Sequence, residues 1–305
     1  MRKYFFVIVL LFLMNCSSEP NTENTTIPKK AEVQLVKTKA ERTPPLKNTL
    51  YPKDRIEIKK RLQQKIKNKE PLLIHTFVPL CDNDNQGIVP VNKSLGDGFN
   101  LRTNLYWGAL YGVKTHFKKQ KEWKLLFSQK DLNSNVLERV IFYKKFSNGA
   151  EVYLVADAYR GDRMKKCLTD YFDALSGKSQ SEYDFLDKKI GIEGNADLIV
   201  FNGHNGLMDT NVEMPTETNS TAKDAIAVAC ISFEYVDKFY QQVNAFPLLC
   251  TNNLLAPEAY VLENVFNTWA MLKDEKDIHH AAGSAYNQYQ KCGLRGAKRL
   301  FKSGW

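Results

Sequence analysis

Apolar residues occur in short runs along most of the chain, and the spacing of these runs predicts that strands alternate with helices. The run 72–80 is almost continuously apolar, which is typical of a strand buried on both faces of a sheet. Asn148-Gly149, the dipeptide favoured in tight hairpins, lies between two further runs. The expected strands are 72–80, 138–146, 151–159, 197–201, 224–229 and 245–250.

Helical spacing of apolar residues marks most of the segments between these strands. The expected helices are 101–117, 163–175, 257–271 and 276–292. The charged segment 52–70 places Ile58, Leu62 and Ile66 at intervals of four residues, which predicts a short basic amphipathic helix. Strands separated by helices indicate a mainly parallel sheet with helices on both faces. We therefore expect one α/β domain at 71–305, built as a three-layer sandwich.

Residues 1–16 have the layout of an export signal. Arg2 and Lys3 precede the apolar run 4–14, which is too short to span a bilayer and fits the central region of a signal peptide. The run ends in Leu13-Met14-Asn15-Cys16, which resembles the lipobox of bacterial lipoproteins. The resemblance implies acyl chains on Cys16 and a membrane-anchored protein of the cell envelope, on its periplasmic or outer-surface side. An ordinary signal peptide with a chance cysteine is the alternative.

The net charge of +9 is unevenly distributed. The excess of Lys and Arg lies before residue 71, whereas basic and acidic residues balance over 71–305. Proteins that bind nucleic acid usually carry their basic patch on the folded domain, so we expect no nucleic-acid partner. The polar segment 17–51 cannot bury enough apolar surface to fold and is expected to be a flexible tether near the membrane.

Two expected strands end in residues that carry chemistry. The strand at 197–201 is followed by Gly203, His204, Asn205 and Gly206, a polar turn that presents a histidine. The strand at 224–229 delivers Cys230. Neighbouring parallel strands would bring both ends to one edge of the sheet, where ligands bind in such folds. An imidazole beside a thiol favours the nucleophilic thiolate.

This pair of motifs resembles the caspase–gingipain clan of cysteine peptidases, which end one buried strand in His-Gly and the next in Ala-Cys or Gly-Cys. The resemblance implies a caspase-like fold, with Cys230 as nucleophile and His204 as general base or proton donor. Backbone amides from Gly203 to Asn205, in the turn that Gly206 closes, would then bind the oxyanion. Asn205 departs from the family, which usually has glycine after the histidine.

The remaining polar clusters give weaker signals. Asp82 and Asp84 follow the first strand and could select a basic substrate side chain, although a solvated turn is the alternative. Lys93 stands where a calcium loop needs a glutamate, and no zinc spacing is present, so we expect no metal or cofactor. After Cys16 the cysteines are odd in number, so at least one thiol stays free or pairs between chains; all five could be free. These are Cys81, Cys167, Cys230, Cys250 and Cys292.

Three interpretations follow. The first is a lipid-anchored cysteine hydrolase that cleaves a peptide or protein substrate with His204 and Cys230. The second, motivated by Asn205, is a catalytically inactive relative that binds a peptide, glycan or partner protein in the same cleft. The third is a structural envelope lipoprotein, in which Cys230 ends a core strand as a packing residue.

Overall fold

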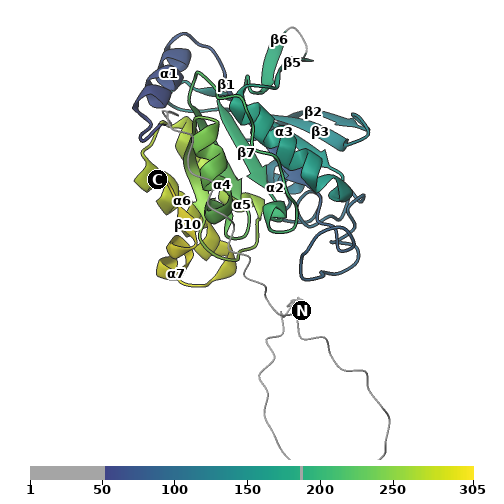
Figure 1. Cartoon of the computed structure of the whole chain (residues 1–305). Helices are drawn as coiled ribbons and strands as arrows, with labels where there is room; N and C mark the ends of the chain where they lie inside the picture. Colours follow the sequence, from purple (N-terminus) through teal and green to yellow (C-terminus); the bar gives the residue numbers. More distant parts are fainter. Residues whose placement is uncertain (1–51, 186–187) are drawn as a thin grey trace, which may run out of the picture. The chain divides into compact units, whose positions relative to one another are not determined.

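The computed structural model describes residues 52–185 and 188–305 (Figure 1). The export signal, Cys16 and the tether at 17–51 lie outside the described residues, so the expectations about them stay predictions. No helix within the described ranges is long and apolar enough to cross a membrane.

Within these ranges, eight strands form a mixed sheet in the order β10-β9-β8-β7-β1-β4-β3-β2. The five strands from β9 to β4 are parallel to one another, while β10, β3 and β2 each pair antiparallel with the strand next to them. The strands are β1 (Leu72–Pro79), β2 (Lys124–Lys130), β3 (Val136–Lys145), β4 (Glu151–Tyr159), β7 (Leu198–Asn202), β8 (Lys223–Val228), β9 (Ala245–Thr251) and β10 (Phe301–Lys302). The expected α/β class with a mainly parallel sheet is confirmed.

Helices cover both faces of the sheet, and its central strands are therefore buried along their whole length. One apolar cluster joins the sheet to α1 (Ile56–Lys67), α2 (Val113–Lys119), α5 (Ala259–Ala270) and α6 (Glu275–Gln290). The other joins it to α3 (Met164–Ser176), α4 (Ser232–Gln242) and a hairpin of β5 (Gln180–Phe185) and β6 (Lys188–Glu193). In Figure 1, α3 and α4 cross one face of the sheet. The short helix α7 (Leu294–Arg299) leads into β10.

The expected helix at 101–117 is wrong over most of its length, since α2 begins at Val113. The buried Asn104 amide donates to the Cys81 carbonyl oxygen (2.8 Å) and accepts from the Cys81 amide N–H (3.0 Å). Its Oδ1 also accepts from the Tyr106 amide N–H two residues on (3.1 Å), a local contact that competes with helical hydrogen bonds. A Cβ on Gly108 would lie 2.2 Å from the Leu101 carbonyl oxygen, so the chain folds back on itself here. The aromatic segment is thus a packed loop beyond the carboxyl end of β1.

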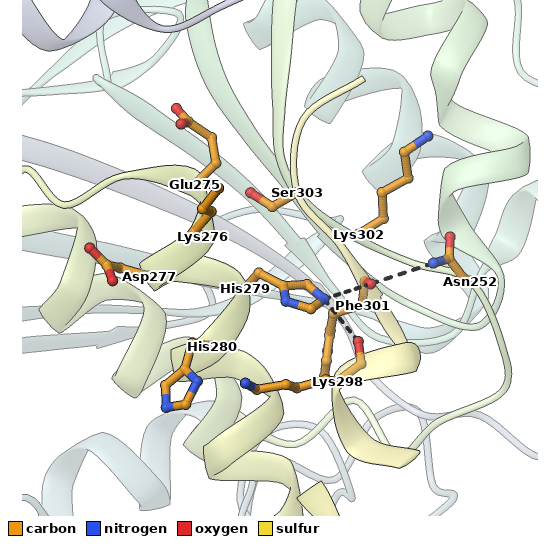
Figure 2. Close-up of a pocket in the computed structure, with 10 residues that line it drawn as sticks. All are labelled: Asn252, Glu275, Lys276, Asp277, His279, His280, Lys298, Phe301, Lys302 and Ser303. Atoms are coloured by element: carbon orange, nitrogen blue, oxygen red, sulfur yellow. Dashed lines mark hydrogen bonds between the residues drawn. The ribbon is translucent and has the colours of Figure 1, made fainter. Parts of the chain in front are cut away.

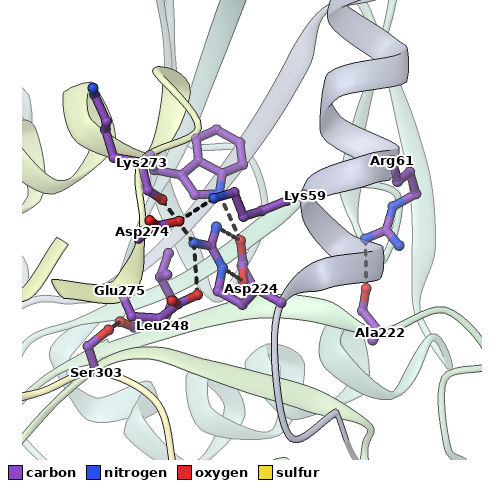
Figure 3. Close-up of polar contacts among 11 residues, drawn as sticks. Lys59, Arg61, Ala222, Asp224, Leu248, Lys273, Asp274, Glu275 and Ser303 are labelled. Carbon is purple, nitrogen blue, oxygen red and sulfur yellow. Dashed lines mark hydrogen bonds and ion pairs between the residues drawn. The ribbon is translucent and has the colours of Figure 1, made fainter. Parts of the chain in front are cut away.

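The basic helix α1 is part of the folded core. Ile58 and Leu62 are buried in the same cluster as the sheet. Arg55, just before the helix, is 2% exposed, and its guanidinium donates to both Asp224 carboxylate oxygens at 2.8 and 2.6 Å. Asp224 also accepts from the Trp269 indole (2.9 Å), and Figure 3 shows this carboxylate within the polar network. Asp224 is the second residue of β8, so Arg55 and α1 attach near the amino end of this strand, opposite the strand ends that carry His204 and Cys230.

Candidate functional site

The two candidate motifs lie side by side at the carboxyl edge of the sheet. β7 and β8 are adjacent and parallel, with Asn202 opposite Val228 in register. The Gly203-His204 turn and the Ala229-Cys230 turn therefore leave the sheet at the same level. The Asn205 side chain joins them, because its amide Nδ2 donates to the Cys230 carbonyl oxygen at 2.7 Å.

His204 is held by a carboxylate that the sequence analysis missed. The imidazole is 7% exposed, and its Nε2 is hydrogen-bonded to Asp209 Oδ2. The same oxygen accepts from the Gly87 amide N–H (3.0 Å), which ties the loop after β1 to this turn. An ionised Asp209 assigns the proton to Nε2 and leaves Nδ1 as the basic nitrogen. Among the described residues, Nδ1 has no hydrogen-bond partner. The sequence did offer one signal for this contact: Asp209 lies only five residues after His204, within the same turn segment.

Cys230 stands at a strained turn between β8 and α4. Its thiol is half-buried and donates to the Leu255 carbonyl oxygen at 3.6 Å. Within the described residues the thiol and the His204 imidazole share no hydrogen bond. The next residue, Ile231, has φ +50° and ψ +32°, a left-handed conformation that is unusual for a β-branched side chain and costs about 1–3 kcal/mol. Such strain persists only where surrounding contacts impose it.

Ser232 and Thr251 are among the contacts that hold this turn. The buried Ser232 hydroxyl donates to the Ala227 carbonyl oxygen (2.6 Å) and accepts from the Thr251 amide N–H (3.0 Å). The Thr251 hydroxyl accepts from the Ser232 amide N–H (3.0 Å) and donates to the Ala229 carbonyl oxygen. These bonds join the start of α4 to the ends of β8 and β9, and they hold the chain on both sides of Cys230.

The other described cysteines are in different environments. Burial raises the pKa of the Cys81 thiol to about 11 and that of Cys250 to about 12, and it raises the pKa of Cys167 as well. These thiols are protonated and sealed from solvent at neutral pH. Cys292 is exposed, and all five described cysteines are free.

The glycines of the histidine turn serve packing rather than left-handed backbone. The Gly203 amide N–H donates to the Val228 carbonyl oxygen (3.2 Å), and that of Gly206 to the His204 carbonyl oxygen (3.0 Å). A Cβ on Gly206 would lie 2.2 Å from the Met164 side chain of α3. Both N–H groups are therefore in use within the fold. Of the amides expected to bind an oxyanion, those of His204 and Asn205 remain the candidates, and this role stays a prediction.

The Asp82 and Asp84 side chains differ in their exposure to solvent. Asp82 is buried, and its carboxylate accepts from the backbone amides of Asp84 (2.9 Å) and Asn85 (3.1 Å). Its second oxygen accepts from the Asn85 side chain (2.9 Å). Asp82 thus stabilises its own loop from a buried position, while Asp84 is exposed. A role for either in substrate selection stays a prediction.

Two tyrosines lie near Cys230, and the sequence analysis did not select them. Burial is the main cause that raises the pKa of Tyr106 well above its ordinary value. The neighbouring Cys81 and, to a smaller extent, Cys230 add to this shift. The Tyr286 hydroxyl accepts from the Ala256 amide N–H (3.2 Å), and burial raises its pKa. Both phenols are therefore neutral at physiological pH and give the thiol an uncharged, aromatic neighbourhood.

A separate open pocket of about 620 Å³ lies along α6, α7 and β10 (Figure 2). Lysines, histidines and acidic residues all line it, so its charge is mixed. The His279 Nε2 contacts the carbonyl oxygens of Lys298 (2.9 Å) and Phe301 (3.2 Å), which gives this imidazole a bracing role. Within the described residues, no group of three or more His, Cys, Asp or Glu side chains could hold a metal ion.

No protein-family model, curated protein or solved structure matches this chain. The functional assignment therefore rests on the geometry of its own residues.

Proposed function

We propose that the protein is an exported, lipid-anchored cysteine hydrolase that cleaves peptide bonds at the carboxyl edge of its sheet. The observation that carries the proposal is the link between the two turns: Asn205, next to His204, bonds to the Cys230 carbonyl oxygen, while Asp209 holds His204 Nε2. A nucleophile, a base and a group that orients the base are the three parts of an activated-nucleophile site. The expected Cys16 anchor would place this site outside the cytoplasm.

The chemistry would proceed in two stages. Rotation about the Cys230 χ1 angle frees the thiol from the Leu255 carbonyl oxygen, and His204 Nδ1 takes its proton. The thiolate sulfur then bonds to the carbonyl carbon of the substrate, and Asp209 stabilises the imidazolium. The imidazolium returns the proton to the leaving amine as the carbon–nitrogen bond breaks, which leaves a thioester. Water, deprotonated by His204, then attacks the thioester, and the released thiolate recovers that proton.

The decisive experiment is alkylation of each thiol by iodoacetamide from pH 5 to pH 9, on the full chain in detergent, with mass spectrometry as the readout. Cys292 is an internal reference because it is exposed. We expect Cys230 to react at least about tenfold faster than Cys292 near pH 7, and His204→Ala to remove that advantage. The buried Cys81, Cys167 and Cys250 should stay unmodified until the protein unfolds. An inert Cys230, or one indifferent to His204, contradicts the hydrolase.

A second candidate function is binding of an apolar polypeptide segment at the same edge of the sheet without cleavage. Leu254 is 63% exposed and precedes the residue whose carbonyl accepts from Cys230; Met208 is 42% exposed and precedes Asp209. Exposed apolar side chains thus flank both halves of the site, and in this candidate they would pack against the bound polypeptide. The thiol contact also supports this candidate, because Cys230 donates to the Leu255 carbonyl oxygen and not to His204.

Peptidyl chloromethyl ketones distinguish the two functions. A probe with leucine next to the warhead should bond covalently to Cys230 in a hydrolase, with loss of chloride. Protection of the 203–209 and 252–258 backbone from deuterium exchange by the matching peptide, without labelling of Cys230 by the ketone, would favour the binding protein. Leu254→Asp should weaken the interaction in both cases, and Leu294→Asp, on an exposed leucine of α7, is the matched control.

A further inference from the structure

Asn205 spans the two halves of the site with one side chain. It is 2% exposed, its Nδ2 donates to the Cys230 carbonyl oxygen (2.7 Å), and its Oδ1 accepts from the Leu207 amide N–H (3.3 Å). The backbone of Asn205 has φ −77°, which most residues adopt easily, so the main chain does not demand an asparagine here. The reason for an asparagine at this position therefore lies in its side-chain hydrogen bonds and not in its backbone conformation.

The peptide group between Cys230 and Ile231 is fixed at both ends. Its carbonyl oxygen accepts from Asn205, and its N–H donates to the Asn253 carbonyl oxygen (3.1 Å). Asn205 belongs to the turn after β7, and Asn253 to the loop after β9. This peptide plane leads directly into the left-handed Ile231, so rotating it would redirect both the Cys230 side chain and the start of α4.

We infer that Asn205 is a positioning residue for Cys230, an inference that rests on the proposed function. Its amide couples the orientation of the cysteine turn to the turn that carries His204. Capping the short 3₁₀ turn Gly206–Met208 needs only a hydrogen-bond acceptor, which a serine hydroxyl supplies. Reaching the Cys230 carbonyl needs a donor at the length of the asparagine amide. The residue that departs from the caspase–gingipain pattern thus replaces a small turn residue with a bond between the two turns.

The test compares Asn205→Ser, which keeps an acceptor for the Leu207 N–H but lacks the amide donor, with the wild type. The readouts are the ratio of Cys230 to Cys292 alkylation rates from pH 5 to pH 9, and deuterium uptake in the 226–236 segment. We expect the ratio at pH 7 to fall at least about fivefold, its pH profile to approach that of Cys292, and uptake to rise. Asn133→Ser, in the exposed β2–β3 turn, is the matched control and should change neither.

The outcomes separate this inference from the proposed function. If His204→Ala lowers the ratio but Asn205→Ser leaves the ratio and pH profile unchanged, the positioning role is wrong and the hydrolase stands. If His204→Ala has no effect, the proposed function fails, and the positioning role fails with it. If the serine variant folds poorly, Asn205→Gly takes its place. A ratio and pH profile equal to those of the wild type in that variant would equally overturn the inference. Unchanged uptake in α3 verifies that each variant is folded.

Discussion

Asp209 shows how a single side chain can decide the tautomer of a catalytic candidate. It contacts His204 Nε2 and is itself fixed by the Gly87 amide, so the imidazole and the loop after β1 share one carboxylate. Because an ionised carboxylate accepts hydrogen bonds, the imidazole proton lies on Nε2 and the lone pair on Nδ1. The basic nitrogen of His204 is therefore set by a residue outside the motif that identified the histidine.

Asp209→Asn should lower the rate of Cys230 alkylation at pH 7 at least about tenfold. The amide would favour the other tautomer and would no longer stabilise the imidazolium. The measurement is the Cys230 rate relative to Cys292, from pH 5 to pH 9. Asp84→Asn, the same change on an exposed aspartate of a neighbouring loop, should leave the rate unchanged. A wild-type rate in Asp209→Asn would show that the carboxylate serves only the loop.

At the scale of elements, most strands and helices follow from local pattern, and the exceptions have physical causes. β4 matches its expected bounds, and α3 ends at Ser176, followed by Gly177, whose φ of +78° suits glycine. β2 and the β5–β6 hairpin were not expected, since their alternating burial leaves only half of each strand apolar. Helix α4 was also missed. Its start depends on the Ser232–Thr251 bonds, which join segments 19 residues apart.

A buried ion pair adds to the apolar contacts that attach α1 to the fold. Arg55→Met should destabilise the fold by about 3–5 kcal/mol, because it leaves the Asp224 carboxylate buried without its cation. Urea unfolding of the variant measures this loss. Asp224→Asn in the same chain should recover part of the loss, since the unpaired charge is removed. Lys60→Met, which breaks the exposed pair with Glu57, is the control and should leave the unfolding midpoint unchanged. A midpoint for Arg55→Met equal to the wild type would contradict this role.

At the scale of the whole molecule, buried charges make stability depend on pH. Burial lowers the pKa of Lys223 to about 8, although its Nζ donates to the Ala196 carbonyl oxygen and Asp197 lies nearby. In the unfolded chain this lysine titrates near 10.5. Between these values the unfolded state binds more protons than the folded state, so the contribution of Lys223 to stability rises with pH.

The stability of the wild type relative to Lys223→Met should therefore increase by about 2 kcal/mol between pH 7 and pH 10. Measuring the difference between the two proteins removes the opposing effect of the buried tyrosines, whose raised pKa values reduce stability above pH 10. Denaturant unfolding at each pH supplies the numbers. Lys178→Met, on an exposed lysine, should show no such trend. A constant difference for Lys223→Met would mean that Lys223 keeps its ordinary pKa in the folded state.

The sequence alone determined the α/β class with its mainly parallel sheet, and it singled out the two residues on which the proposed site is built. Hydrophobic periodicity is a local property, and a short apolar run such as 72–80 is typical of a strand in the interior of a sheet. His204 and Cys230 were visible because each ends such a run. Tertiary structure decided how the site is held: Asp209 on the imidazole, Asn205 across the two turns, and the Ser232–Thr251 bonds beneath the cysteine. These contacts depend on the register of neighbouring strands and on loop paths, which are set by long-range packing and leave no periodic trace in the chain.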